Sequence, residues 1–232
     1  MKILAIETSS KVCAVALFED NKLIKEKIIE DENTHSVKLM PLIDELLKET
    51  NIDLNNIDLF SCDKGPGSFT GIRIGIATIK AFIDVTNKNS IGITSLEALT
   101  YNVEEDGIIC SMIDAKNENV YYGFFKKEYN KVEKLDELKF GNINDVFKEI
   151  IDNYDKIIFI GNASKEYKNI IEENLKQKAI FIEDIEKNKL NARNIALAAF
   201  NNRKEAGDTN LLLPVYLRKS NAERMLEGNK WM

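Results

Sequence analysis

The order of strand-like and helix-like segments restricts the fold of this chain most, because the same order occurs twice. In the first half, apolar alternation bounded by turn residues predicts the order βββαβαβα, at residues 2–7, 12–19, 23–29, 35–49, 57–62, 69–86, 89–94 and 95–102. The order starts again after residue 107, at residues 108–114, 120–126, 131–140, 143–153, 156–161, 163–176, 179–183 and 192–205. Any chain that alternates strands with helices can be read as a repeat, but eight elements in matching order favour a duplication.

A duplicated βββαβαβα unit predicts a two-domain α/β fold, with a mixed sheet flanked by helices in each domain. The first three strands of each unit are expected to be antiparallel and the later ones parallel. The predicted parts are a first domain at 1–105, a second, reduced domain at 106–210, and a tail at 211–232 that packs back on the first domain. The boundary is expected in NVEEDG, residues 102–107.

Composition indicates an ordinary globular protein that does not wrap nucleic acid by itself. The 232 residues are 44% hydrophobic and 30% charged, which is typical of a folded chain with a large core. The net charge of −6 argues against the basic surface that phosphate neutralisation needs, so any contact with RNA is expected to be local or to come through a complex. Cys13, Cys62 and Cys110 lie far apart and favour a reduced, cytoplasmic protein. We expect no signal peptide, because Glu7 interrupts the N-terminal segment too early for an apolar core, and no membrane span, because no segment approaches ~18 uninterrupted apolar residues.

A glycine-rich segment, CDKGPGSFTGIRIG at residues 62–75, joins a predicted strand to a predicted helix. Exposed N–H groups at a helix start attract anions, so a phosphate site is one interpretation. The spacing fits neither a P-loop, which needs a Gly-Lys pair, nor a dinucleotide fingerprint, in which a glycine would replace Thr70. In the first interpretation, a remnant phosphate cleft is lined by Glu7, Thr8, Ser9, Gly65, Gly67 and Ser68. In the second, which we favour, Gly65 and Gly67 form a tight turn and Ser68 caps the helix.

The helix after this segment is apolar on two sides. At 100° per residue, one stripe is expected to pack on the sheet: Phe69, Ile72, Ile76, Ile79 and Ile83. Charge is confined to a narrow strip and the opposite side is again apolar or small, so another surface must cover it. The helix near 35–49 is also widely apolar, and the two helices could cover each other within one domain. A surplus remains, and we expect a partner-binding surface of Leu39, Ile43, Thr70, Ile74, Ala77, Thr78, Ala81 and Val85.

Six segments resemble the motifs of the TsaB family, also called YeaZ, in matching order and over essentially the whole chain. They are ILAIETSSKVCAVAL, THSVKLMPLIDELL, GPGSFTGIRIGIATIKAF, GITSLEAL, IDAKNENVYYGFF and PVYLRKSNAERM. The resemblance implies the fold of the actin, sugar kinase and heat-shock ATPase superfamily. It also implies a non-catalytic partner of TsaD, in the bacterial machinery that puts threonylcarbamoyl on the adenosine next to certain tRNA anticodons, with the small ATPase TsaE as a third partner.

Individual residues agree with a non-catalytic role. The related subunit TsaD carries a His-x-x-x-His metal pair, whereas the single histidine here is His35 and Leu39 stands four positions later. We therefore expect no metal site, no catalytic residue and no cofactor, and we expect His35 to begin its helix after the N-cap Thr34. The glycine-rich adenosine loop of the superfamily's nucleotide binders is reduced to Gly161. The alternative function is a small independent kinase or ATPase of the same superfamily, while a peptidase would need a nucleophile and base that the sequence does not pair.

The expected partners are TsaD and TsaE, with tRNA bound only through the complex. A second copy of this chain is the expected partner when TsaD is absent. Arg218, Lys219 and Arg224 in the tail could touch tRNA, but so few charges favour a solvated tail.

Overall fold

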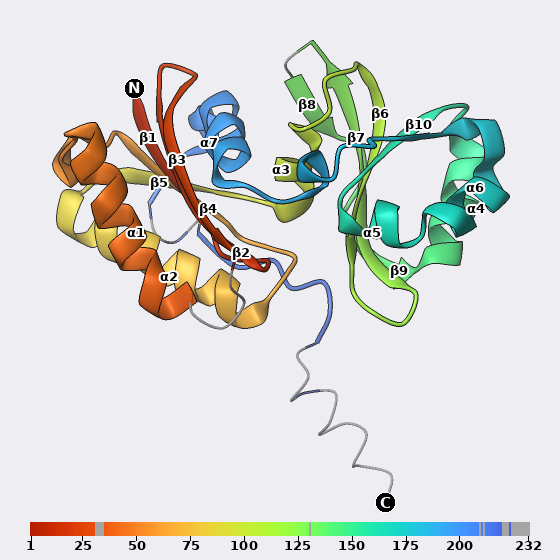
Figure 1. Ribbon diagram of the computed structural model, residues 1–232, viewed down its shortest axis with the longest axis horizontal. Coiled ribbons are helices and arrows are strands. Elements are labelled where there is room, and N and C mark those ends of the chain that lie inside the picture. The colour runs from red at the N-terminus through yellow and green to blue at the C-terminus, as the bar shows by residue number, and fades with distance from the viewer. Residues whose placement is uncertain (31–34, 130, 209, 211, 220–222, 224–232) are drawn as a thin grey trace, which may run out of the picture.

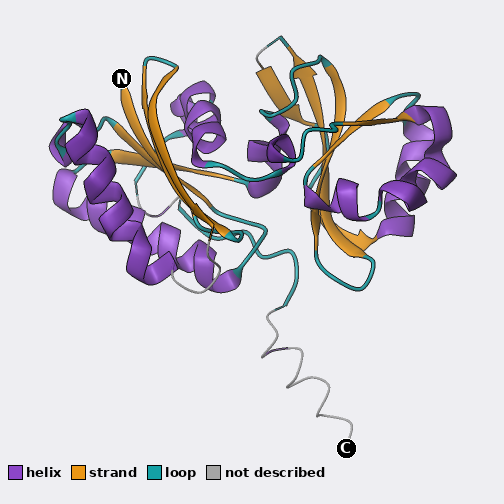
Figure 2. Cartoon of the chain, viewed as in Figure 1, coloured by secondary structure: helices purple, strands orange, loops and turns teal. Residues whose placement is uncertain are grey.

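The computed structural model describes residues 1–30, 35–129, 131–208, 210, 212–219 and 223, which form two lobes (Figures 1 and 2). The first lobe is built on a five-stranded sheet with the order β3-β2-β1-β4-β5. Its strands are β1 (Lys2–Glu7), β2 (Val12–Glu19), β3 (Lys22–Glu30), β4 (Leu59–Asp63) and β5 (Asn89–Ile93). β1 pairs antiparallel with β2 and parallel with β4, so the sheet is mixed, as predicted.

Two long helices cover one face of the first sheet. α1 (His35–Thr50) and α2 (Phe69–Thr86) contact each other and share one apolar core with β1, β2 and β4. The inner side of α2 follows the helical period, because Ile72, Ile76, Ile79 and Ile83 are all buried. Phe69, which was expected in the same stripe, is only partly buried and stacks on Tyr216.

The second lobe is built on a six-stranded sheet with the order β11-β10-β6-β7-β8, and β9 also pairs with β7. Its strands are β6 (Gly107–Asp114), β7 (Asn119–Glu128), β8 (Lys131–Lys134), β9 (Lys139–Asn142), β10 (Ile157–Ile160) and β11 (Ala179–Phe181). The first-lobe order, read as β3-β2-β1-β4-β5, matches β8-β7-β6-β10-β11 position by position. The duplicated topology is thus present, while the domain boundary at 102–107 stays a prediction.

Two predicted elements of the second half are divided. The strand predicted at 131–140 is two strands, because its pairing with β7 stops at Lys134 and resumes at Lys139. Between them the Leu138 side chain packs against Gly123, where a β-carbon would lie 2.6 Å from it. The helix predicted at 163–176 is α5 (Asn162–Glu166) and α6 (Lys168–Leu175), and it breaks at Tyr167, whose backbone is not helical. The other helices of this half are α4 (Ile143–Asn153) and α7 (Ala192–Asn201).

The last helix of each half packs on the sheet of the other half. α3 (Ser95–Thr100) contacts β6 and β7, and α7 contacts β1 and β2, so each crosses from its own half of the sequence (Figure 1). α7 lies close to the first sheet because small residues face each other there: Ala14 and Ala16 of β2 share a buried cluster with Ala192. The sequence did not predict this exchange.

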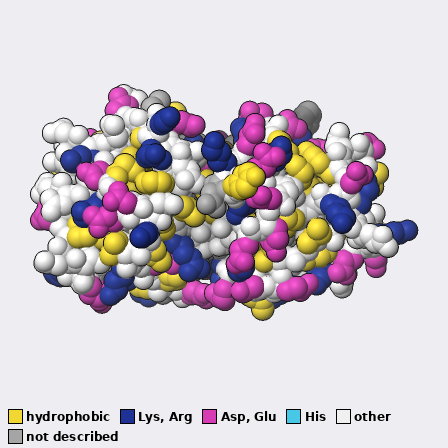
Figure 3. Space-filling view, turned by 90° about the horizontal axis from the view of Figure 1, so that it is seen from above, with side chains coloured by type: hydrophobic (Ala, Val, Ile, Leu, Met, Phe, Trp, Pro, Cys, Tyr) yellow, Lys and Arg dark blue, Asp and Glu magenta, His cyan; other side chains and the backbone are white. Residues whose placement is uncertain are grey.

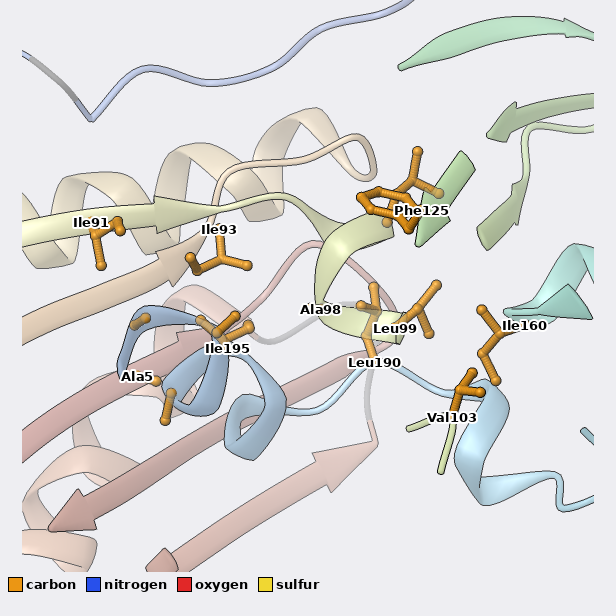
Figure 4. Close-up of a cluster of buried hydrophobic side chains, with 14 of the residues drawn as sticks. Ala5, Ile91, Ile93, Ala98, Leu99, Val103, Phe125, Ile160, Leu190 and Ile195 are labelled. Carbon is orange, nitrogen blue, oxygen red and sulfur yellow. The ribbon is translucent and has the colours of Figure 1, made fainter. Parts of the chain in front are cut away.

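One apolar core joins the two lobes as a result. It includes Ile91 and Ile93 from the first sheet, Phe125 and Ile160 from the second, and Leu99 from α3 between them (Figure 4). A third core lies between the second sheet and the helices α4 to α6. None of the helices within the described ranges has the length and apolar character needed to cross a bilayer.

The described part of the tail contacts both lobes. Leu212 is buried in the core of the first lobe, and the Val215 N–H donates to the Lys64 carbonyl oxygen at 2.7 Å. The Tyr216 ring stacks on Phe69 with 4.4 Å between centroids, and Arg218 donates to the carbonyl oxygen of Ala115 in the second lobe at 3.0 Å.

Candidate functional site

The glycine-rich segment forms a turn that carries the first residues of α2. Ser68 is the N-cap, and its side-chain oxygen accepts from the Gly71 N–H at 3.2 Å. Gly65 has a φ of +99°, which a side chain would disfavour. These features match the second of the two interpretations, a tight turn followed by a capped helix.

The turn between β1 and β2 is pressed directly onto this segment. The Ser68 N–H donates to the Ser9 carbonyl oxygen at 2.7 Å, and a β-carbon on Gly67 would lie only 2.5 Å from the same oxygen. The Thr8 hydroxyl donates to the Gly71 carbonyl oxygen at 2.8 Å, and a β-carbon on Gly71 would lie 1.8 Å from the Thr8 carbonyl oxygen. The glycines therefore let another part of the same chain approach this segment closely.

The residues of the predicted remnant cleft lie around this contact. Glu7, Thr8, Ser9 and Gly65 are buried and Ser68 is exposed, and the Ser68 N–H donates to the Ser9 carbonyl oxygen. Whether a phosphate binds beside these residues stays a prediction, and the sequence did not predict the backbone contact between residues 8–9 and the glycine turn. A hollow of about 100 Å³ remains beside Thr8 and His35, well below the roughly 300 Å³ at which small-molecule sites begin.

A buried pair of carboxyl groups lies beneath the turn. Glu7 ends β1 and Asp63 ends the neighbouring strand β4, and both side chains are excluded from solvent. The Ser9 hydroxyl lies 3.1 Å from Glu7 Oε1 and 3.0 Å from Asp63 Oδ2, and the Ser95 hydroxyl lies 2.7 Å from Asp63 Oδ1. Burial first, and then the charge of Asp63, raise the pKa of Glu7 well above its ordinary value. Sequence analysis singled out Glu7 but not Asp63.

The corresponding acid of the second half has different surroundings. Asp114 ends β6, forms an ion pair with Lys116 at 2.8 Å, and accepts from the Tyr167 hydroxyl at 3.0 Å. Gly161 follows the end of β10, where a β-carbon would lie 2.0 Å from a carbonyl oxygen of β6. Across the described ranges, no three His, Cys, Asp or Glu side chains gather as a metal site would need.

His35 begins α1, as predicted, and its ring is buried. Nε2 lies 3.0 Å from the Val12 carbonyl oxygen, which can only accept, so Nε2 carries the hydrogen. The proposed N-cap Thr34 lies outside the described residues, as does Arg224 of the tail.

The predicted partner-binding surface divides into exposed and buried residues. On α2, Thr70, Ala77 and Ala81 are exposed and 71% of Val85 is accessible, whereas Ile74 and Thr78 are half-buried. Ile74 packs against the core of the first lobe.

Leu39 and Ile43 cannot belong to this surface, because they are only 1% and 2% exposed in the core of the first lobe. They face the sheet together with Leu42 and Leu46, and the exposed apolar side chains of α1 are instead Val37 and Met40. We call the exposed set on the two adjacent helices the docking face; it comprises Val37, Met40, Thr70, Ala77, Ala81 and Val85.

A second hollow, of about 660 Å³, lies between the β7–β8 hairpin and the end of α7. Tyr101 and Tyr129 line it, and its charges are balanced, with Lys126 and Glu128 paired at 2.7 Å. No sequence pattern predicted this hollow.

Solved structures with the same architecture define the class of this protein. YeaZ from Pseudomonas aeruginosa superposes with a TM-score of 0.77 at 23% identity, over 93% of this chain and 99% of that one. Component A of (R)-2-hydroxyglutaryl-CoA dehydratase from Acidaminococcus fermentans superposes with a TM-score of 0.52 at 8% identity, over 88% of this chain and 99% of that one. The fold is thus the duplicated α/β fold that these two proteins share.

Sequence comparisons identify the family within this class. The family model described as TsaD: tRNA N6-adenosine threonylcarbamoyltransferase matches residues 22–226. The tRNA threonylcarbamoyladenosine biosynthesis protein TsaB of Bacillus subtilis (strain 168) is 31% identical over 99% of this chain and 100% of its own length. The chain belongs to the TsaB family, which confirms the resemblance drawn from its motifs.

Proposed function

We propose that this chain is a non-catalytic accessory subunit in the synthesis of threonylcarbamoyladenosine in tRNA, and that it binds the transferase TsaD together with the ATPase TsaE. The observation that supports this best is the similarity over the full length of a relative named as a biosynthesis protein rather than as a transferase. The close contact of the Thr8 and Ser9 backbone with the glycine turn agrees with it, because it leaves a hollow of only about 100 Å³ for a phosphate-bearing substrate.

The docking face is the proposed contact with TsaD. It lies on two adjacent helices, and its own six side chains are small or apolar and uncharged, a composition that suits the centre of an interface. The exposed charges of the C-terminal half of α1, Asp44, Glu45, Lys48 and Glu49, would lie at its rim. A stable interface needs roughly 800 Å² from each partner, which is more than one helix supplies, so both α1 and α2 are included. When TsaD is absent, the same face is proposed to pair with a second copy of this chain.

Contact with tRNA is proposed to come through the complex. The net charge is −6, and basic and acidic side chains are intermingled over the face shown in Figure 3. Such a surface lacks the continuous positive charge that binds a phosphate backbone. Because tRNA is the substrate of the pathway, we propose that the chain works in the cytoplasm.

Reconstitution tests the proposal. Purified chain, TsaD and TsaE are combined with unmodified tRNA, ATP, threonine and a source of the activated threonylcarbamoyl group, and the modified nucleoside is measured after digestion. We expect product from the full mixture, none from this chain alone, and a loss of product when this chain is omitted. Equal product with and without the chain would contradict the accessory role.

The kinase or ATPase alternative is tested in the same preparation. We expect no ATP hydrolysis above background by this chain alone. Turnover that survives repurification and disappears in Glu7→Gln would favour the enzyme instead.

A further inference from the structure

The carboxyl groups of Glu7 and Asp63 are neighbours for a reason of topology. β1 and β4 are parallel and adjacent, with Ile6 opposite Cys62, so the next residue of each strand brings the two acids to the same edge of the sheet. Both side chains are fully buried there. No ion pair to either acid exists among the described residues, so the pair has no cation to balance two negative charges.

The hydrogen-bond donors around the pair are enough for one carboxylate, not two. Asp63 accepts from the Gly65 N–H at 2.6 Å and from the Ser95 hydroxyl at 2.7 Å. Glu7 accepts from the Ser10 N–H at 3.0 Å. The Ser9 hydroxyl lies near both acids but has a single hydrogen to donate. A second full charge would thus be buried and poorly solvated, which disfavours ionisation of both acids at once.

We propose that Glu7 and Asp63 share one proton, and that this proton is a latch that holds the β1–β2 turn closed on the glycine turn. Glu7 carries the proton and donates it in a hydrogen bond to the Asp63 carboxylate. Ser9 joins the pair to the turn, because its hydroxyl contacts both acids while its carbonyl oxygen accepts from the Ser68 N–H at 2.7 Å. Loss of the proton leaves two carboxylates facing each other, and the repulsion loosens residues 8–10 from residues 64–68.

The groups packed around the pair do not compensate that repulsion. On β2 and β4, the Cys13 and Cys62 thiols have a pKa that burial raises and that the nearby carboxylates raise further. Lys38 of α1 lowers the pKa of Cys13, and Lys64 and Lys80 lower that of Cys62, while the largest influences on the pKa of Glu7 are its burial and the charge of Asp63. His35 of α1 bonds to the backbone of β2, and Glu97 of α3 is bonded to Asn202.

The latch predicts the direction in which pH changes stability. Because the folded chain holds the Glu7 proton more tightly than the unfolded chain, the contribution of Glu7 to stability is fully present below the ordinary glutamate pKa of 4.5. It falls as the pH rises from there through the raised pKa of the folded state. One proton changes the ratio of folded to unfolded chain by up to tenfold per pH unit.

Urea unfolding of the full chain between pH 5 and pH 9 tests the proposal, with wild type compared with Glu7→Gln. The glutamine amide still donates to Asp63 and accepts from the Ser10 N–H, but it has no proton to lose. We expect wild type to lose stability with rising pH relative to Glu7→Gln, and its ratio of folded to unfolded chain should fall by up to tenfold per pH unit. Ser9→Ala is the matched control, since it weakens the cluster but keeps both acids, and it should keep the wild-type pH slope. Parallel curves for wild type and Glu7→Gln would overturn the latch.

Two measurements do not depend on a well-folded variant. The infrared spectrum of wild type in D₂O at neutral pH should contain the carbonyl band of a protonated, buried carboxyl group, and its absence would overturn the proposal. Amide exchange of residues 8–10 and 64–68 should accelerate with pH more than the chemical rate does. Exchange at these residues that follows the chemical rate alone would contradict a latch that opens.

Discussion

Ala77→Asp is the sharpest test of the docking face. Ala77 is exposed at the middle of α2, so the change removes no core contact and leaves the inner stripe intact. The cost to folding is limited to the lower helix propensity of Asp, about 0.6 kcal/mol, and it is partly offset because Arg73 and Lys80 lie one turn away on either side. We expect the isolated chain to lose less than about 1 kcal/mol of unfolding free energy.

The cost to association is expected to be larger. At the centre of a helix-to-helix contact the new carboxylate loses its water and has no partner, which costs about 2 kcal/mol or more. Since 1.4 kcal/mol is a factor of ten, the Kd for TsaD should rise by about 30-fold. Isothermal titration of TsaD with each variant measures this, and urea unfolding followed by circular dichroism measures the folding cost.

The matched control is Ile151→Asp on α4. Ile151 is also an exposed apolar residue on a helix, with 50% of its surface accessible, but it belongs to the second lobe, away from the docking face. We expect it to leave the Kd unchanged. Ile74→Asp is a poorer test, because Ile74 also packs on the core and its loss would destabilise the chain. If Ala77→Asp and Ala81→Asp both fold and bind TsaD with wild-type affinity, the contact lies elsewhere.

Three further predictions concern the chain alone. Gly71→Ala should destabilise the chain by about 1–3 kcal/mol in urea unfolding, although alanine usually stabilises a helix relative to glycine, because the new β-carbon would lie 1.8 Å from a carbonyl oxygen of the β1–β2 turn. The control Gly141→Ala should cost less than about 1 kcal/mol, because its nearest neighbour would lie 3.6 Å from the new β-carbon. Tyr216→Ala should cost about 1 kcal/mol through the lost ring stack, whereas Tyr129→Ala, at an 87% exposed position, should cost almost nothing in thermal unfolding. Burial raises the pKa of Cys13 to about 11, so at pH 8 the native thiol should react with a disulfide reagent far more slowly than the urea-unfolded chain, and equal rates would contradict its burial.

The order of elements could be predicted because it depends on local signals. Alternating apolar residues, turn residues and the cap at Ser68 act within a few positions, and β1, β2, α1 and α2 lie within a residue or two of their predicted ranges. The division of the strand at 131–140 is accompanied instead by a contact between Leu138 and Gly123, which lie fifteen residues apart. The packing of α3 and α7, each on the sheet of the other half, also consists of contacts between distant parts of the chain. Neither contact leaves a periodic pattern in the sequence.

The assignment of the outer side of α1 was a mistake that the sequence could have prevented. Leu39, Leu42, Ile43 and Leu46 have the spacing of a single helix face, and all four are buried. A helix with apolar residues on several sides offers more than one such face, and the assignment of Leu39 and Ile43 to a partner ignored this one. Asp63 could also have been found, because an acid that ends a strand parallel and next to the Glu7 strand must lie at the same sheet edge.

The glycine turn illustrates why a motif alone does not define a site. Glycine in such a turn removes side-chain bulk so that something can come close, and the sequence does not say what comes close. Here the backbone of Thr8 and Ser9 occupies the space, and Ser9 also contacts the acids below it. The start of α2 is thus fixed from beneath by the turn and from the side by the Phe69–Tyr216 stack, while its outer residues stay exposed. A helix held this rigidly loses little conformational entropy on binding, which favours its use as a docking element.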